Sequence, residues 1–188
     1  MSLVSFYPGP SKVYSNTTEY IYEAYASGIL SINHRSEEFM HLFGKLKKTL
    51  HKKLKVPKNY EIAFVSSATE CWEIISQSVV KNRIAVCHNG AFGEKWAAYA
   101  AGQSPDCIEL PFEVEEELPI GKITAAEADV VGIVHNETSN GTFLSDPIME
   151  GLRSNLSSDT LVTVDATSSM AGLALPFSLP LSPSRQLV

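Results

Sequence analysis

The sequence predicts an α/β fold in which a mixed, mostly parallel sheet lies between helices. Two observations support this fold class. Short, apolar, β-branched runs alternate along the chain with stretches of helical periodicity, a pattern typical of parallel sheets that helices cover on both faces. In addition, 44% of the 188 residues are hydrophobic and 19% are charged, so the chain can bury a core and is not a disordered protein. Its length fits one ordinary domain.

The N-terminal part is predicted to be an extended arm followed by two helices. Residues 1–15 contain a Pro-Gly-Pro sequence, which disfavours regular structure. A first helix is expected over Thr17–Ala26. A second begins after Ser36, whose hydroxyl can cap it, and ends before Pro57. Seven of the fifteen basic residues lie between 45 and 58, and we interpret them as the solvated face of this helix.

Strands and helices alternate over the rest of the chain. Five strands are expected, at Glu61–Val65, Arg83–Cys87, Cys107–Leu110, Asp129–Val134 and Leu161–Asp165. The helices expected between several of these strands are Thr69–Val80, Phe92–Ala101 and Asp146–Asn155.

The composition excludes several classes of protein. The formal net charge of −6 argues against a general nucleic-acid-binding protein, because phosphate neutralisation needs a positive surplus. No apolar stretch reaches membrane-spanning length, and the N-terminal residues do not form a secretory signal. The three cysteines include no CxxC pair for zinc, and their odd number suits no disulfide framework. We therefore expect a cytoplasmic protein with no metal site and no membrane partner.

Polar clusters follow four of the predicted strands. In open α/β sheets, ligands bind beyond the carboxyl ends of the strands, so these clusters are the candidate site. They are Ser66-Ser67-Ala68-Thr69, His88-Asn89-Gly90-Ala91-Phe92, His135-Asn136-Glu137-Thr138 and Asp165-Ala166-Thr167-Ser168.

Two of these clusters each allow a functional and a structural interpretation. Residues 66–69 combine hydroxyls with backbone amides at a helix N-terminus, which suits a phosphate group, but they also suit a plain N-cap. Asp165 ends an apolar strand and needs a partner there. That partner could be a protonated pyridine nitrogen, or Asp165 could cap the amides of Thr167 and Ser168.

The other two clusters contribute an aromatic ring and a hydroxyl. Phe92 heads a predicted helix and could offer a flat surface to a cofactor ring, although it could equally be a core residue. Thr138 offers a hydroxyl at a strand end. No GxxxxGK[ST] occurs, and no GxGxxG follows any predicted strand, so nucleoside-triphosphate and NAD sites are disfavoured.

In chain order, these features are a phosphate cradle, an aromatic platform, a hydroxyl donor and a strand-end aspartate. The sequence resembles the class V aminotransferases, which are fold-type I pyridoxal-phosphate enzymes, and most closely the phosphoserine aminotransferase-like branch of serine biosynthesis. The resemblance runs from about residue 5 to about residue 179. The segments that carry it are 6–10 (FYPGP), 32–39 (INHRSEEF), 135–141 (HNETSNG) and 164–169 (VDATSS).

The resemblance implies roles for individual residues. Phe92 would stack on the ring of pyridoxal 5′-phosphate, Thr138 would bind its phenolic oxygen, and Asp165 would pair with its nitrogen. His34 and Arg35 would contact the substrate's phosphate and reach into the site of a neighbouring subunit, which implies a homodimer. The complete set expected to bind the cofactor is Ser67, Ala68, Thr69, Phe92, Thr138 and Asp165.

The resemblance also implies an organisation into parts. We expect an arm at 1–15, the N-terminal part of a fold-type I large domain at 16–179, incomplete at its C-terminal end, and an atypical tail at 180–188. The Ser66–Glu70 segment replaces the glycine-rich, arginine-containing loop of the phosphoserine branch and looks more like other class V members. No lysine follows Asp165 in the sequence, although the family places its Schiff-base lysine at or just beyond the position of Val188.

We therefore expect an aminotransferase that transfers an amino group between a small amino acid and a 2-oxo acid. The chain as written is expected to be inactive alone, because the Schiff-base lysine is absent. The alternative is a truncated, non-catalytic product that pairs with a full-length subunit.

Overall fold

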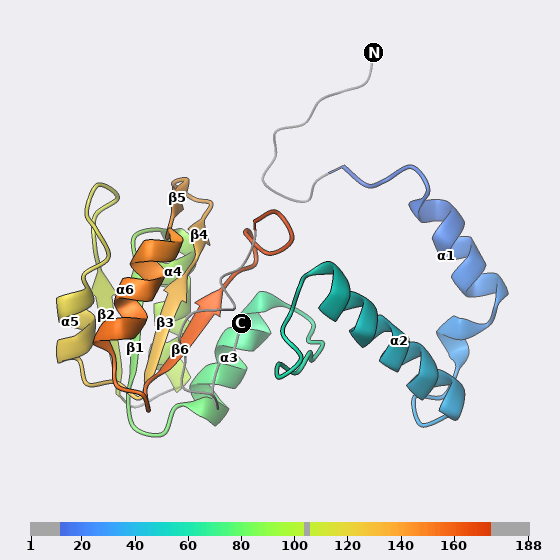
Figure 1. Cartoon of the computed structure of the whole chain (residues 1–188), viewed down its shortest axis with the longest axis horizontal. Helices are drawn as coiled ribbons and strands as arrows, with labels where there is room; N and C mark the ends of the chain where they lie inside the picture. Colours follow the sequence, from blue (N-terminus) through green and yellow to red (C-terminus); the bar gives the residue numbers. More distant parts are fainter. Residues whose placement is uncertain (1–11, 104–105, 174–188) are drawn as a thin grey trace, which may run out of the picture. The chain divides into compact units, whose positions relative to one another are not determined.

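The computed structural model describes residues 12–103 and 106–173. The chain divides into two compact units, Met1–Val56 and Pro57–Val188 (Figure 1). The predicted division into 1–15, 16–179 and 180–188 stays a prediction, because residues 1–11 of the arm and all residues beyond 173 lie outside the described residues.

The first unit contains the two predicted helices. Helix α1 (Thr17–Ala26) and helix α2 (Glu37–Lys53) are joined by a short 3-10 turn, η1 (Ile29–Ser31). Gly28 precedes that turn with a φ of 74°, a conformation that favours glycine. Ser36 caps α2 as expected, since its Oγ accepts a hydrogen bond of 3.2 Å from the amide of Phe39. The start of α2 is thus set by a local sequence signal.

The second unit is built on the predicted parallel sheet. Its strands are β1 (Ile84–His88), β2 (Cys107–Pro111), β3 (Val130–Val134) and β6 (Leu161–Asp165). They lie in the order β2-β1-β3-β6, and all three neighbouring pairs are parallel. This confirms the predicted fold class.

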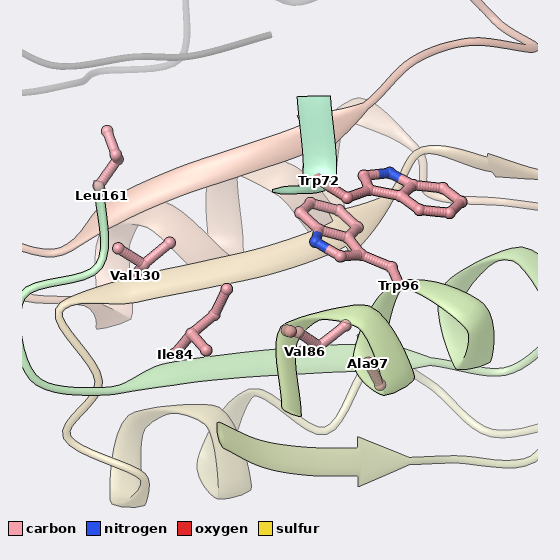
Figure 2. Close-up of a cluster of buried hydrophobic side chains, with 8 residues drawn as sticks. Trp72, Ile84, Val86, Trp96, Ala97, Val130 and Leu161 are labelled. Atoms are coloured by element: carbon pink, nitrogen blue, oxygen red, sulfur yellow. The ribbon is translucent and has the colours of Figure 1, made fainter. Parts of the chain in front are cut away.

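Helices cover both faces of the sheet. On one face, α3 (Ala68–Ile74) and α4 (Ala91–Gln103) contribute Trp72 and Trp96 to a core with Ile84 and Val86 of β1 (Figure 2). On the other face, α5 (Ile120–Ala125) and α6 (Asp146–Asn155) enclose a second core, made largely of Cys87, Ile123, Val131, Ile133, Met149, Leu152 and Val162. Successive residues of each strand thus enter opposite cores.

One predicted strand is wrong. Residues 61–65 form no strand, and no described strand pairs with them. A strand needs hydrogen bonds from a neighbour, and the edges of the described sheet, β2 and β6, are formed by other segments. The apolar run therefore did not predict a strand, because no described strand lies beside it in a sheet.

Smaller differences concern short elements. The helix predicted over Thr69–Val80 is α-helical over Ala68–Ile74 and continues as a π-helical turn, η2 (Ile75–Val79). Helix α5 was not predicted, because a six-residue element gives little periodicity. Two-residue strands, β4 (Asn136–Glu137) and β5 (Thr142–Phe143), also pair as a small antiparallel ribbon directly after β3.

Candidate functional site

The order of the strands creates a switch point between β1 and β3. From β1 the chain moves outward to β2 and then returns to the other side of β1 to form β3. Crevices at such points, beyond the carboxyl ends of the strands, are the usual ligand sites of open α/β sheets. In register, His88 pairs with Pro111 and Val134 pairs with Asp165, so all four strands end along one edge. We call it the carboxyl edge.

Asp165 lies half-buried at this edge with both carboxylate oxygens bonded. Its Oδ2 accepts a hydrogen bond of 3.0 Å from Trp72 Nε1, and its Oδ1 accepts one of 2.9 Å from the amide of Thr167. Its backbone oxygen accepts a bond of 2.9 Å from the amide of His135. The capping of Thr167 expected in one interpretation is therefore present. Each carboxylate oxygen still has a lone pair that can accept from a cationic N–H.

Trp72 links helix α3 to Asp165 through the hydrogen bond of its indole. Its indole is buried and stacks on Trp96 of α4, with ring centroids 6.0 Å apart and planes 10° from parallel. The negative charge of Asp165 also acts on Cys71, the preceding residue, where it adds to burial in raising the pKa of the thiol. The N-terminal turn of α3, which carries the predicted phosphate-binding residues, therefore belongs to the same edge of the sheet.

The start of α3 is a reciprocal cap. Ser67 Oγ accepts a hydrogen bond of 3.1 Å from the amide of Glu70, and Glu70 Oε2 accepts from the amide and hydroxyl of Ser66 at 2.7 and 2.5 Å. These bonds lower the pKa of Glu70, with the Ser66 hydroxyl as the main cause. The plain N-cap interpretation is thus confirmed. Within the described chain, the amides of Ala68 and Thr69 still lack an acceptor.

Phe92 stands in the first turn of α4 with 46% of its side chain exposed, so it is not a core residue. This helix can begin so close to β1 only because residue 93 is glycine. A Cβ at Gly93 would lie 2.4 Å from the Cβ of His88. The ring at position 92 is therefore held near the end of β1 by a close backbone approach.

Thr138 occupies the turn between β4 and β5, beyond the end of β3. This turn is tied to the loop after β1: Asn140 Nδ2 donates to the backbone oxygen of Asn89 at 2.6 Å, and Asn89 Nδ2 donates to Thr142 Oγ1 at 3.0 Å. The two loops that border the switch point are thus joined by side-chain hydrogen bonds.

Glu137 is a site residue that the sequence interpretation did not single out. It is 2% exposed, yet it is a carboxylate, and its partners are backbone amides and a hydroxyl rather than a cation. Its Oε2 accepts from the amides of Phe92 and Gly93 at 3.2 and 3.1 Å. The local sequence holds no sign of this contact, because the partners are more than forty positions apart.

His135 was also not assigned a role. The side chain is buried, its Nδ1 lies 2.8 Å from Ser169 Oγ, and its ring contacts Phe143. Its Nε2 has no hydrogen-bond partner among the described residues. Burial lowers the pKa of this imidazole, against a smaller opposing effect of Asp146.

His34 and Arg35 lie in the first unit, in the turn before α2, and both are exposed. The amide of Arg35 donates to Asn33 Oδ1 at 2.8 Å. A surface ion pair of Arg35 with Glu37 or Glu38 would be a structural alternative to a role in substrate binding, and within the described part of the chain no such pair is formed. Their proposed contact with a substrate phosphate stays a prediction.

The described residues contain neither a metal-binding cluster nor a membrane-spanning helix. Among residues 12–103 and 106–173, no group of three or more His, Cys, Asp or Glu side chains is arranged to hold a metal ion. None of the helices described there is long and apolar enough to cross a membrane.

A parallel sheet with helices on both faces, and with an aspartate at the end of β6, defines an α/β protein whose candidate ligand site is its carboxyl edge. The family model "Aminotransferase class-V" matches residues 8–177. The chain therefore belongs to the class V aminotransferase family, as the sequence resemblance indicated.

Individual relatives point to one branch of this family. The chain is 30% identical over 167 residues to phosphoserine aminotransferase of Corynebacterium glutamicum, covering 88% of this chain and 43% of that protein. It is 24% identical over 166 residues to the phosphoserine aminotransferase of Rhodococcus opacus, with the same coverage of 88% and 43%. The chain thus spans less than half the length of these curated relatives.

Solved structures share the fold. The crystal structure of a phosphoserine aminotransferase from Cytophaga hutchinsonii superposes with a TM-score of 0.82 and 29% identity, over 92% of this chain and 48% of that one. Pyridoxamine-pyruvate aminotransferase from Mesorhizobium loti gives a TM-score of 0.76 and 18% identity, over 95% and 45% of the two chains. The second likeness shows the fold alone.

Proposed function

We propose that this chain is part of a pyridoxal-phosphate-dependent aminotransferase and that its carboxyl edge holds the cofactor. The observation that carries the proposal is Asp165, a half-buried carboxylate fixed at the carboxyl edge of the sheet in a class V family member. Both carboxylate oxygens of Asp165 accept hydrogen bonds from neutral donors. No cation among the described residues pairs with the charge of this carboxylate. The position suits a ligand that brings a cationic N–H.

The surrounding groups fit pyridoxal 5′-phosphate. Asp165 would keep a proton on the pyridine nitrogen, and the exposed ring of Phe92 would stack on the heterocycle. Thr138 would donate its hydroxyl to the phenolic oxygen. The free amides of Ala68 and Thr69, with the hydroxyl of Ser67, would bind the phosphate at the start of α3.

When bound, pyridoxal 5′-phosphate acts as an electron sink for negative charge at the α-carbon of an amino acid. The contribution of Asp165 is electrostatic: a carboxylate beside the ring nitrogen favours the protonated, electron-withdrawing ring. Phe92 would exclude water from one face of that ring and fix its plane.

For the substrates, we propose a small amino acid and a 2-oxo acid, with a phosphorylated amino acid of the phosphoserine type as the leading candidate. The names of the curated relatives support this choice. His34 and Arg35 would bind the phosphate, because a guanidinium offers two parallel donors to an anion. A homodimer in the cytoplasm, with these two residues acting in the partner's site, completes the proposal.

Cofactor binding can be tested without turnover. Pyridoxamine 5′-phosphate is a suitable probe, because it carries the ring and phosphate but has no aldehyde to react with surface lysines. Isothermal titration calorimetry should show binding to the wild-type chain and about tenfold weaker binding to Asp165→Asn, which keeps the shape but loses the charge.

Asp129→Asn is the matched control for this experiment. Asp129 is also a carboxylate that accepts backbone amides, those of Lys81, Asn82 and Arg83, but it precedes β3 at the opposite edge of the sheet. The Asp129→Asn variant should bind pyridoxamine 5′-phosphate with the affinity of the wild-type chain. No binding to the wild-type chain, or equal losses in both variants, would contradict the proposed cofactor site.

A further inference from the structure

We propose that Glu137 is a positioning residue that holds Phe92 and Thr138 in register across the switch point. This inference rests on the proposed function, since it concerns the two residues that would contact the ring of the cofactor. Glu137 directly precedes Thr138 in the chain, and its carboxylate bonds to the amide of Phe92. One buried side chain therefore lies between the proposed aromatic platform and the proposed hydroxyl donor.

The carboxylate divides its two oxygens between two segments. Oε2 accepts the amides of Phe92 and Gly93 in the first turn of α4, at 3.2 and 3.1 Å. Oε1 accepts the amide and the hydroxyl of Ser139, at 3.1 and 2.6 Å. A negative charge at a helix N-terminus is further stabilised by the helix dipole. Glu137 thus joins β4 and the turn after it to α4 by ionic hydrogen bonds.

Ser139 completes the cap on the same helix. Its Oγ accepts the amide of Ala91 at 3.0 Å while donating to Glu137. The amide of Glu94 bonds to the backbone oxygen of Gly90 at 3.0 Å. The amides that open α4 are therefore all satisfied within the protein, three of them by Glu137 at the end of β4 and Ser139 in the turn that follows. The direction in which Phe92 leaves the helix depends on that turn.

Close packing makes this arrangement rigid. A Cβ at Gly90 would lie 2.4 Å from Cγ and 2.7 Å from Cδ of Glu137, so the carboxylate occupies the space that any other side chain at position 90 would need. Glu137 itself is 2% exposed. A buried group with satisfied hydrogen bonds on two segments leaves neither segment free to shift alone.

The chemistry of the cap distinguishes glutamate from glutamine. All four partners of Glu137 are donors, so both of its oxygens must accept. A glutamine of the same shape has one acceptor oxygen, and its NH₂ group would face either the two amides of α4 or Ser139. Glu137→Gln therefore breaks the junction with almost no change in volume.

The test measures cofactor-analogue affinity and local protection together. By calorimetry, Glu137→Gln should weaken pyridoxamine 5′-phosphate binding about tenfold, the effect of losing one or two ionic hydrogen bonds. By NMR, the amides of Phe92 and Gly93 should exchange with solvent faster in the free variant. Asp129→Asn, a carboxylate cap at the opposite edge, should lower stability without changing either readout.

A second variant tests the same junction if Glu137→Gln does not fold. Ser139→Ala removes the hydroxyl that bridges Glu137 and Ala91 but leaves the carboxylate in place, and it should weaken the binding about threefold. Wild-type affinity in either folded variant would overturn the positioning role while leaving the cofactor site intact. Absence of binding to the wild-type chain would instead overturn the proposed function, and this inference with it.

Discussion

The helices of the first unit and the helices of the second differ in what their side chains contact. Helix α2 is seventeen residues long and buries none of its side chains, whereas α6, with ten residues, buries Met149, Leu152 and Arg153. The longer helix has the stronger local signals, a side-chain cap and charges matched to its dipole. The shorter one depends on the sheet beneath it.

This difference predicts in which unit a substitution lowers stability most. In the second unit, the cores combine residues from helices and strands that are far apart in sequence, such as Trp72, Trp96 and Val130 (Figure 2). In the first unit, the described apolar side chains are partly or fully exposed, for example Tyr22 and Met40. Truncating an apolar side chain should therefore lower the free energy of unfolding much more in the second unit than in the first.

The largest effect is expected for Trp96→Ala. Trp96 is fully buried, and its ring fits so closely over β3 that a Cβ at Gly132 would lie 3.0 Å from it. Removing the indole leaves a cavity and should lower the free energy of unfolding by about 3–5 kcal/mol. Met40→Ala in α2, where the side chain is 59% exposed, should change it by less than about 0.5 kcal/mol. Urea denaturation followed by circular dichroism measures both.

Similar losses in the free energy of unfolding for the two variants would contradict the difference between the two units, because they would mean that Met40 packs as closely as Trp96.

A smaller effect is expected from pH, again confined to the second unit. Burial lowers the pKa of His135 in the folded chain, so the unfolded chain binds the proton more readily. The stability that the neutral imidazole contributes is therefore complete above its ordinary pKa of 6.5 and is lost as the pH falls below that value. Ser169 and Phe143 also contact the imidazole, and the charge of Asp146 and the backbone of Leu144 raise its pKa, but they offset only part of the effect of burial.

The measurement is the free energy of unfolding at about pH 7.5 and about pH 5. The wild-type chain should lose more stability between these values than His135→Asn. His41→Asn, at an exposed position of α2, should keep the wild-type pH dependence. An unchanged slope in His135→Asn would show that His135 binds a proton as readily in the folded chain as in the unfolded chain, against the lowered pKa.

The smallest expected effect compares two helix caps. Ser36 caps α2 through its side chain, whereas Ser145 precedes α6 without a side-chain cap bond. Ser36→Ala should therefore cost about 1 kcal/mol, and Ser145→Ala should cost less. Thermal or urea unfolding followed by circular dichroism would show the difference, and the reverse order would mean that local capping does not stabilise α2.

Most of the fold could be predicted because its signals are local. The strands β1, β2, β3 and β6 read as apolar runs, and α2 carried a cap and a clear period. Residues 61–65 read the same way, yet pairing depends on a neighbour that no local pattern reveals. Helix α5 and the β4–β5 ribbon are too short to give a period.

The candidate site was predictable only in part, for a related reason. The rule that ligands bind at strand ends selects Asp165, Phe92 and Thr138 directly from the sequence. Glu137 stands in the same segment, but its importance arises from a contact with residues 92 and 93, which only the folded chain brings near it. Trp72 gave no sequence signal of a role at this edge either, because its bond to Asp165 joins residues that only the folded chain brings together.

The stacked pair of Trp72 and Trp96 gives the chain a built-in optical reporter. These are its two tryptophans, and with ring centroids 6.0 Å apart and nearly parallel planes their electronic transitions must couple. Because Trp72 Nε1 is bonded to Asp165, displacement or neutralisation of that carboxylate changes the environment of one member of the pair. The near-ultraviolet signal of the unlabelled protein should therefore follow events at the carboxyl edge of the sheet directly.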